Sequence, residues 1–468
     1  MSPLRSELRK PYGALVFFVV ATLFAGDLQA QDSKPASAPT TRPDSGPTPV
    51  ALPTPPPPPS PVATIDAEGR FLVRGKPVFI NGWYSDGDPG RLRRLADGGF
   101  NAVLDYGLTA RPVAATRAYL AEAERLGVMV IAAVHDVYPS ATHRNELGEW
   151  KGNDQILTGV MGVLRGSPAV VAYYVHDELS VEKLAEMQGF SRRVRELDPT
   201  RPLVLVHETP ALCGVFGDTA DVFGIDHYPI PKDGPGAFAP VFDAARASLD
   251  ARRPLWAVLQ NFAWYQHRTA LPPVVAGDQT TERARLPMPA EWTANRPPTR
   301  DETRAMHYVA LARGAQGLLW WCLYNLDFLP DRAERWEDAV RLSAETNALA
   351  PYLLGADGPP VVWSDPRVLA RIKRLPDGRR ILIAVNTAPE PVRVVATVDP
   401  DVAAAAAAAS RPDSRATTRP ESAPATPQRP ASTRSIDVLF ESRLVRVVDG
   451  ALIDFFAPYE RHVYRLDA

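Results

Sequence analysis

Cysteine is scarce in this sequence: Cys213 and Cys322 are the only two in 468 residues. This excludes a small scaffold held together by disulfides and a cysteine-based metal cluster, because both need more cysteines at short spacings. The strand pattern described below places the two residues in the fifth and eighth strand–helix units, which are not neighbours. We therefore expect two free, buried thiols.

The chain also lacks an excess of either charge, with 52 Lys and Arg against 54 Asp and Glu. This near-neutral balance gives no reason to expect nucleic acid or an anionic membrane as a partner. One long apolar run is present, at residues 14–25, and it follows Arg5, Arg9 and Lys10. The layout predicts a signal peptide over residues 1–30, because the run is too short to span a bilayer comfortably. An uncleaved anchor is the alternative, and we expect an exported protein with no other membrane contact.

Prolines number 48 and gather in two segments, residues 31–62 and about 399–433. Both segments also contain many Ser, Thr and Ala residues and have too few large apolar side chains to form a core. The first is predicted to be an extended, disordered linker. The second interrupts a β-rich region and is predicted to be a disordered insertion between strands.

Residues 63–357 alternate short apolar runs with helical patterns, which predicts a (β/α)8 barrel. No glycine-rich turn follows the first run, so the competing open, doubly wound sheet is less well supported. A capping box of Thr299 and Glu302 marks one helix start, and Gly127 marks a helix end. The predicted strands are Val78–Trp83, Ala102–Tyr106, Val128–Val134, Ala169–Val175, Leu203–His207, Val222–Asp226, Leu255–Gln260 and Gly317–Trp321.

Residues 358–468 show short alternating strands joined by tight turns. Pro376-Asp377-Gly378 lies between two such strands, and Asp449-Gly450 lies between two more. Both are typical β-hairpin connections. We expect a small antiparallel β-sandwich after the barrel.

The run Ala169–Val175 ends abruptly in His176, Asp177 and Glu178. In parallel barrels the chemistry lies at the carboxyl ends of the strands. Carboxylates mixed with aromatic side chains there suit a sugar, because acids protonate the glycosidic oxygen and aromatic rings stack on sugar C–H surfaces. The candidate catalytic residues are Glu178, Asp177 and Asp226. The candidate substrate-binding residues are Trp83, Tyr84, His176, Tyr228, Gln260, Trp264, Trp320 and Trp321, of which Trp320 and Trp321 point to opposite faces of their strand.

Three stretches, Gly75–Trp83, Ala172–Glu178 and Phe455–Tyr464, resemble the opening strand, the acid/base strand and the accessory-sandwich strands of the glycoside hydrolase superfamily. The resemblance covers Ile65 to the end of the chain, less the insertion. It is greatest to the clan whose acid/base follows strand four and whose nucleophile ends strand seven, which implies that Glu178 is the proton donor. The chain departs from this pattern at Gln260, where an amide stands in place of the nucleophilic glutamate.

Three interpretations follow from that departure. Asp226 could supply the second carboxylate; the adjacent Asp177 and Glu178 resemble hexosaminidase-type enzymes, in which the acetamido group of the substrate attacks; or the barrel binds glycan without cleaving it. The reading that Asp177 only caps the following helix, and Asp226 only braces a turn, also stays open.

A metal-dependent hydrolase built on His135, His207 and His227 is a further alternative. It lacks the paired histidines that metal amidohydrolases carry on strand one. We expect a carbohydrate substrate, no metal and no cofactor.

Overall fold

The computed structural model describes residues 60–141, 146–267, 294–398 and 433–467. The predicted signal peptide at 1–30, residues 31–59 of the predicted linker and residues 399–432 of the predicted insertion lie outside these ranges. Within the described ranges, no helix combines the length and apolar character needed to cross a bilayer. Both cysteines are free and buried, as expected.

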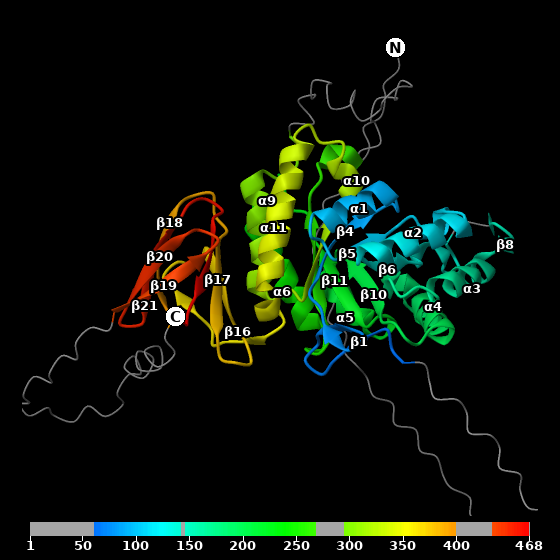
Figure 1. The fold of residues 1–468 in the computed structure, drawn as a ribbon, viewed down its shortest axis with the longest axis horizontal. Helices are drawn as coiled ribbons and strands as arrows, with labels where there is room; N and C mark the ends of the chain where they lie inside the picture. Colours follow the sequence, from blue (N-terminus) through cyan, green and yellow to red (C-terminus); the bar gives the residue numbers. More distant parts are fainter. Residues whose placement is uncertain (1–59, 142–145, 268–293, 399–432, 468) are drawn as a thin grey trace, which may run out of the picture. The chain divides into compact units, whose positions relative to one another are not determined.

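Eight parallel strands close into a barrel, in which each strand pairs with the next along the chain and the last pairs with the first. All eight predicted strands are present, with ends that differ from the prediction by at most two residues, and the (β/α)8 barrel is confirmed (Figure 1). The barrel strands are β4 (Ile80–Ser85), β5 (Ala102–Asp105), β6 (Met129–Ala133), β9 (Val170–Asp177), β10 (Leu203–His207), β11 (Val222–Asp226), β12 (Leu255–Gln260) and β13 (Gly317–Trp321).

Helices connect the strands and cover the outside of the barrel. The capping box of Thr299 and Glu302 starts α9, and Gly127 ends α2 in the left-handed conformation, both as predicted. The helices are α1 (Pro89–Asp97), α2 (Val113–Leu126), α3 (Asn153–Leu164), α4 (Leu184–Leu197), α5 (Pro210–Val215), α6 (Phe238–Ser248), α9 (Arg300–Arg313), α10 (Leu323–Leu326) and α11 (Arg332–Leu353).

Alternate residues of each barrel strand point to opposite sides. One set fills the barrel interior, including Tyr84 on β4 and Trp256 on β12. The other set packs beneath the surrounding helices, including Trp83 on β4 and Trp320 on β13. This alternation decides which strand-end side chains can reach a pocket in the barrel mouth.

The C-terminal region forms one nine-stranded sheet with the order β14-β16-β17-β22-β19-β20-β21-β18-β15. Side chains from β16 to β22 pack together into a core of their own, as expected for a β-sandwich. Both predicted hairpins are present, β16 with β17 and β20 with β21. The strands are β14 (Ala356–Asp357), β15 (Val362–Trp363), β16 (Val368–Arg374), β17 (Arg380–Asn386), β18 (Val392–Thr397), β19 (Thr433–Leu439), β20 (Arg443–Val448), β21 (Ala451–Phe456) and β22 (Arg461–Arg465).

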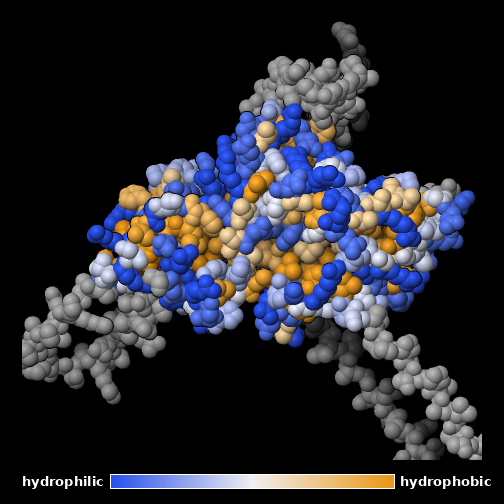
Figure 2. Space-filling model, in the orientation of Figure 1, coloured by the Kyte–Doolittle hydropathy of each residue, from blue (hydrophilic) through white to orange (hydrophobic). Residues whose placement is uncertain are grey.

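The two faces of this sheet differ in what covers them. On β17, Ile381 and Ile383 join the apolar cluster of the barrel helices, whereas Leu382 and Ala384 point into the sandwich core. Apolar surface shows over the sheet in Figure 2. Phe455 on β21 is 63% exposed.

Two small sheets complete the fold. Strands β1 (Ala63–Ile65), β2 (Phe71–Val73) and β3 (Lys76–Pro77) form an antiparallel sheet just before the barrel. Strands β7 (Glu146–Leu147) and β8 (Trp150–Lys151) form a hairpin in the connection between β6 and β9.

Candidate active site

A pocket of about 270 Å³ opens at the carboxyl ends of the barrel strands. It contains all three predicted catalytic residues and four of the eight predicted substrate-binding residues. Its lining residues are Tyr84, Tyr106, Asp177, Glu178, Glu208, Asp226, Tyr228, Phe262, Trp264 and Trp321.

Glu178 and Asp226 lie in direct contact inside this pocket, where their side chains form a carboxyl–carboxyl hydrogen bond. Asp226 is only 5% exposed, whereas Glu178 is exposed to the pocket. Burial raises the pKa of Asp226 well above its usual range, and the bond to Glu178 and its charge raise it further. Burial also raises the pKa of Glu178, to which the charges of Asp177 and Glu208 add. Asp226, the more deeply buried group, therefore holds the proton and donates it to the Glu178 carboxylate.

Asp177 is fixed by two tyrosines rather than by a helix end. The Tyr174 hydroxyl donates to Asp177 Oδ1 at 2.6 Å, and the Tyr106 hydroxyl donates to Asp177 Oδ2. Burial raises the pKa of both tyrosines well above the usual value, so the hydroxyls keep their protons and remain donors. Both carboxylate oxygens of Asp177 are thus engaged on the protein side.

A bulge in β9 sets the directions of its last residues. Along the pairing with β10, Tyr174 lies opposite Val204 but His176 lies opposite Leu205, so Val175 is an extra residue. After the bulge, Asp177 pairs with Val206, which points into the barrel. The bulge therefore turns Asp177 towards the pocket, a use of bulges that is common beside active sites.

Glu178 itself has a left-handed backbone, with φ of 48°. This conformation is costly for a long side chain that cannot bond back to its own backbone. The Glu178 amide donates to Val206 O at 3.1 Å, which ties the residue to the end of β10. Strained backbone of this kind is concentrated at functional sites.

Aromatic rings form the remaining wall of the pocket. Tyr84 and Trp321 are in edge contact with a ring separation of 5.0 Å, and Phe262 lies between Tyr228 and Trp264 at 5.0 and 5.2 Å. Trp264 is 37% exposed and lies at the rim. Four of the predicted substrate-binding residues therefore line the pocket: Tyr84, Tyr228, Trp264 and Trp321.

Gln260 is not in this pocket, which corrects the expectation that it reaches the substrate. Its Oε1 accepts from the Ile230 amide at 2.9 Å, and its Nε2 donates to Ile230 O at 2.8 Å and Phe262 O at 3.3 Å. The side chain is fully used in bracing the loop after β11. Position 260, where the clan that this chain resembles has its nucleophile, therefore holds a loop in place in this protein.

His176 is also outside the pocket, because the β9 bulge turns it outward. It is fully buried with its ring 4.3 Å from that of Phe216, in the layer between strands and helices. Burial lowers its pKa to about 3, so it is neutral. The sequence predicted that His176 would contact substrate, because no local pattern indicates the bulge in β9.

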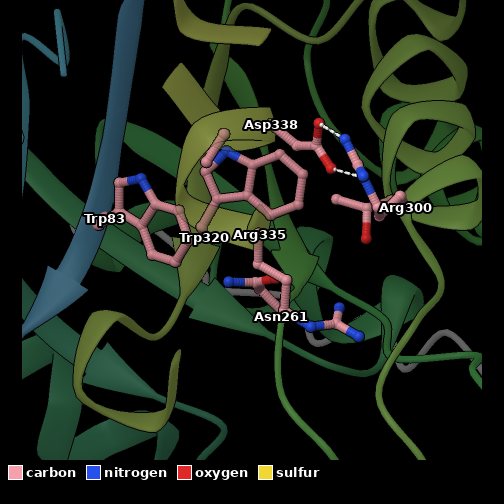
Figure 3. A pocket seen from close by; sticks show the side chains of 8 residues that line it. Trp83, Asn261, Arg300, Trp320, Arg335 and Asp338 are labelled. Atoms are coloured by element: carbon pink, nitrogen blue, oxygen red, sulfur yellow. Dashed lines mark hydrogen bonds and ion pairs between the residues drawn. The ribbon is translucent and has the colours of Figure 1, made fainter. Parts of the chain in front are cut away.

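Trp83 and Trp320 are likewise placed away from the pocket. Figure 3 shows them beside a second, very small cavity under the helices, together with Asn261 and the ion pair of Arg300 and Asp338. Their rings stack at 5.7 Å, and both side chains are buried. Strand alternation is the reason: in each case the neighbouring residue, Tyr84 or Trp321, faces the interior. The expectation that only one of Trp320 and Trp321 faces the cleft is confirmed.

Three lining residues were not among the predicted site residues: Glu208, Tyr106 and Phe262. Glu208 follows β10, whose interior-facing residues are Val204 and Val206, so the same alternation extended past the strand end points to it. Tyr106 could have been found in the same way from Leu104 on β5. Phe262 lies in a loop and has no such signal.

The histidines of the metal alternative do not converge. His207 Nδ1 accepts from the Thr209 amide at 3.0 Å, and its Nε2 faces Leu179 O at 3.1 Å, so both ring nitrogens are engaged. His135 lies against Tyr106 with the rings 4.7 Å apart. Within the described part of the chain, no three His, Cys, Asp or Glu side chains are placed to hold a metal ion.

No known family profile matches the chain, and no curated protein matches it. Among solved structures, the chain is similar to an Anoxybacillus α-amylase, with 12% identity over 83% of this chain and 96% of that one and a TM-score of 0.49. It is also similar to a β-L-arabinopyranosidase of family GH27 from Geobacillus stearothermophilus, with 11% identity, the same two coverages and a TM-score of 0.49. A family 5 mannosidase from Rhizomucor miehei has 9% identity over 61% of this chain and 98% of that one, with a TM-score of 0.41. All three of these neighbours are glycoside hydrolases.

Proposed function

We propose that this protein hydrolyses glycosidic bonds in a poly- or oligosaccharide, with Glu178 as general acid/base and Asp226 as the second carboxylate. The observation that supports this most strongly is the hydrogen-bonded pair of Glu178 and Asp226 in a pocket walled by aromatic rings. Such a pair keeps a proton to higher pH than a lone carboxyl group does, and acid catalysis needs a protonated donor beside the leaving oxygen.

The reaction begins when a sugar ring enters the pocket and separates the two carboxyl groups. The shared proton passes through Glu178 to the glycosidic oxygen as the bond to the anomeric carbon breaks. Asp226, now ionised, then either attacks that carbon or removes a proton from the attacking water. Asp177, held by Tyr106 and Tyr174, orients the acid or the substrate.

A second candidate uses the same residues differently. The adjacent Asp177 and Glu178 suit a mechanism in which the substrate's own acetamido group attacks, with Asp177 orienting that group. The observation that favours it is the rigid hold on Asp177, together with the structural role of Gln260. Activity confined to acetamido sugars would select this candidate.

The test is hydrolysis of a panel of neutral and acetamido oligosaccharides by the wild type and by Glu178→Gln and Asp226→Asn. The matched control is Glu182→Gln, an exposed residue outside the pocket. We expect both pocket variants to lose at least about 100-fold in kcat, as is usual for a general acid or base, and the control to keep wild-type rates. Wild-type activity in Glu178→Gln would refute its assignment. Glycan binding without cleavage by the wild type would select the binding-only alternative.

We also propose that the protein is exported, on the basis of the signal-peptide layout of residues 1–30. Fractionation of cells that express the full chain, compared with a form that lacks these residues, tests this. Export of the full chain alone is the expected result.

A further inference from the structure

Glu178 lies one residue beyond the end of the pairing between β9 and β10, and its backbone is left-handed. The last paired residues are Asp177 on β9 and Val206 on β10, and Glu178 follows with a φ of 48°. This conformation is unfavourable for a residue other than glycine, so it persists only where surrounding groups hold the peptide. The carboxyl group of Glu178 bonds to Asp226 from this position, which makes the support of its backbone relevant to the chemistry.

Two consecutive residues of β10 hold the backbone on either side of Glu178. On one side, the Glu178 amide donates to Val206 O at 3.1 Å. On the other, Leu179 O lies 3.1 Å from His207 Nε2, and the ring nitrogen is the donor because a carbonyl oxygen only accepts. The side chain of Leu179 also packs against the apolar layer beneath the helices. The peptide segment that carries Glu178 is therefore held at both ends from β10.

The tautomer of His207 that this bond needs is fixed by Thr209. The Thr209 amide donates to His207 Nδ1 at 3.0 Å, so Nδ1 presents its lone pair and Nε2 carries the proton. Burial lowers the pKa of His207, which is only 2% exposed, and this keeps the ring neutral. One tautomer thus satisfies both ring nitrogens and directs a donor at Leu179 O.

His207 supports this backbone from outside the pocket. Val206 points into the barrel interior, so its neighbour His207 points towards the surrounding helices. The His207 ring lies 5.8 Å from that of His176 and 6.1 Å from that of Phe216, and it is not among the described residues that line the pocket. Any effect of His207 on catalysis therefore passes through Glu178.

We propose that His207 is a positioning residue, which holds Glu178 in its left-handed conformation by donating a hydrogen bond from Nε2 to Leu179 O. The inference rests on the proposed role of Glu178 as general acid/base, and it adds the residue that keeps this acid in place. A catalytic group displaced by about 1 Å loses about 100-fold in rate, so a bond to the adjoining backbone affects kcat. A merely structural histidine stabilises the fold but leaves the rate of the folded enzyme unchanged.

The test compares His207→Gln with His207→Met, two side chains of similar length of which only glutamine has an N–H donor. Both lack an acceptor at the position of Nδ1, so the loss of the bond from Thr209 is common to the two variants. On a glycan that the wild type cleaves, kcat of His207→Met should fall about 10- to 100-fold, with KM within about twofold of the wild type. His207→Gln should keep kcat within about threefold, because its amide replaces the donor to Leu179 O.

A third variant, His207→Asn, separates the two hydrogen bonds in the opposite way. Its side-chain oxygen still accepts from the Thr209 amide, whereas the shorter side chain does not reach Leu179 O. We expect the same loss of kcat as in His207→Met, although the bond from Thr209 is kept. Thermal unfolding identifies any variant that does not fold, and either His207→Met or His207→Asn supplies the comparison with glutamine.

Hydrogen exchange of peptides that contain Glu178, followed by mass spectrometry, tests the hold on the backbone without any substrate. The Glu178 amide should exchange about three- to tenfold faster in His207→Met than in the wild type and in His207→Gln, as expected for the loss of one hydrogen bond. Peptides from α2, which packs against α1, α3 and β6, should exchange at wild-type rates in all variants.

Two rate measurements would overturn this inference and leave the proposed function intact: wild-type kcat in a folded His207→Met, or an equal loss in His207→Gln. Unchanged exchange of the Glu178 amide in His207→Met would also contradict it. If the wild type cleaves no glycan, the proposed function fails, and exchange alone then decides whether His207 holds Glu178. The two failures are therefore distinguishable.

Discussion

The side chain of Glu178 is hydrogen-bonded directly to that of Asp226. The two carboxyl groups are thus closer than the roughly 5–5.5 Å of retaining glycosidases or 6.5–9.5 Å of inverting ones. In this state the pair stores a proton and leaves no room for an anomeric carbon or a water between its members. Under the proposed function, an entering sugar must separate the pair, and exposed Glu178 is the member that can move, since Asp226 is buried.

The raised pKa of Asp226 predicts a pH-dependent cost to folding. Because the folded-state pKa lies above the unfolded value of about 3.9, the native state binds more protons, and stability is lost as pH rises through the folded pKa. Asp226→Asn removes this loss, so its stability relative to the wild type should increase from pH 4 to pH 8. Urea denaturation at a series of pH values measures this, with exposed Asp218→Asn as the control. A stability difference that does not change with pH would contradict the assignment.

The left-handed backbone of Glu178 predicts that a glycine there stabilises the fold. Glycine adopts a φ of 48° without steric cost, so Glu178→Gly should raise the free energy of unfolding by about 1 kcal/mol while activity is lost. Ala118→Gly, at an exposed position in the interior of α2, is the control, and it should destabilise by about 1 kcal/mol. Destabilisation by Glu178→Gly would mean that no strain is stored at this residue.

Restoring a carboxylate at position 260 should not create a nucleophile. In Gln260→Glu the side chain loses the amide group that donates to Ile230 O and Phe262 O, and it places a charge against two buried carbonyl oxygens. We expect a loss of about 3 kcal/mol in stability, the penalty for a buried unpaired charge, and no gain in hydrolysis. Thermal unfolding and glycan assays measure both, with Gln188→Glu on α4 as the control. A stable, more active variant would show that Gln260 does reach the substrate.

Trp83 and Trp321 should differ in what their loss affects. Trp83 is fully buried beneath the helices, so Trp83→Ala should cost about 3–5 kcal/mol of stability. Trp321 lines the pocket, so Trp321→Phe should weaken glycan binding while leaving most of the stability. Unfolding curves and glycan titrations on both variants separate the two effects. Stronger loss of glycan binding from a still-folded Trp83 variant would contradict its placement.

The barrel and most of its strand ends were predictable because the apolar runs are continuous and end at polar residues. Side chains alternate between the interior and the exterior of the barrel along each strand. Once one residue of a strand is known to face the interior, this alternation predicts that Tyr84 and Trp321 face the interior and that Trp83 and Trp320 face the helices. The same alternation, continued past the end of β10, predicts that Glu208 faces the pocket.

Other features of the site depend on contacts that no local pattern reveals. The bulge at Val175 is set by pairing with β10, and it exchanges the expected directions of His176 and Asp177. The role of Gln260 depends on a loop 30 residues away in the chain. The contact between Glu178 and Asp226 likewise joins different strands, so the sequence could name both residues but not their separation.

The most direct test of the account is a double-mutant comparison of kcat/KM for wild type, Glu178→Gln, Asp226→Asn and the double variant on a glycan that the wild type cleaves. When two residues share a proton and act as one unit, the losses in kcat/KM caused by replacing each of them do not add up in the double variant. We predict that each single variant loses at least about 100-fold and that the double variant loses no more than the worse single one. Single losses below about tenfold, or a double loss equal to the product of the single losses, would contradict a shared catalytic role for the pair.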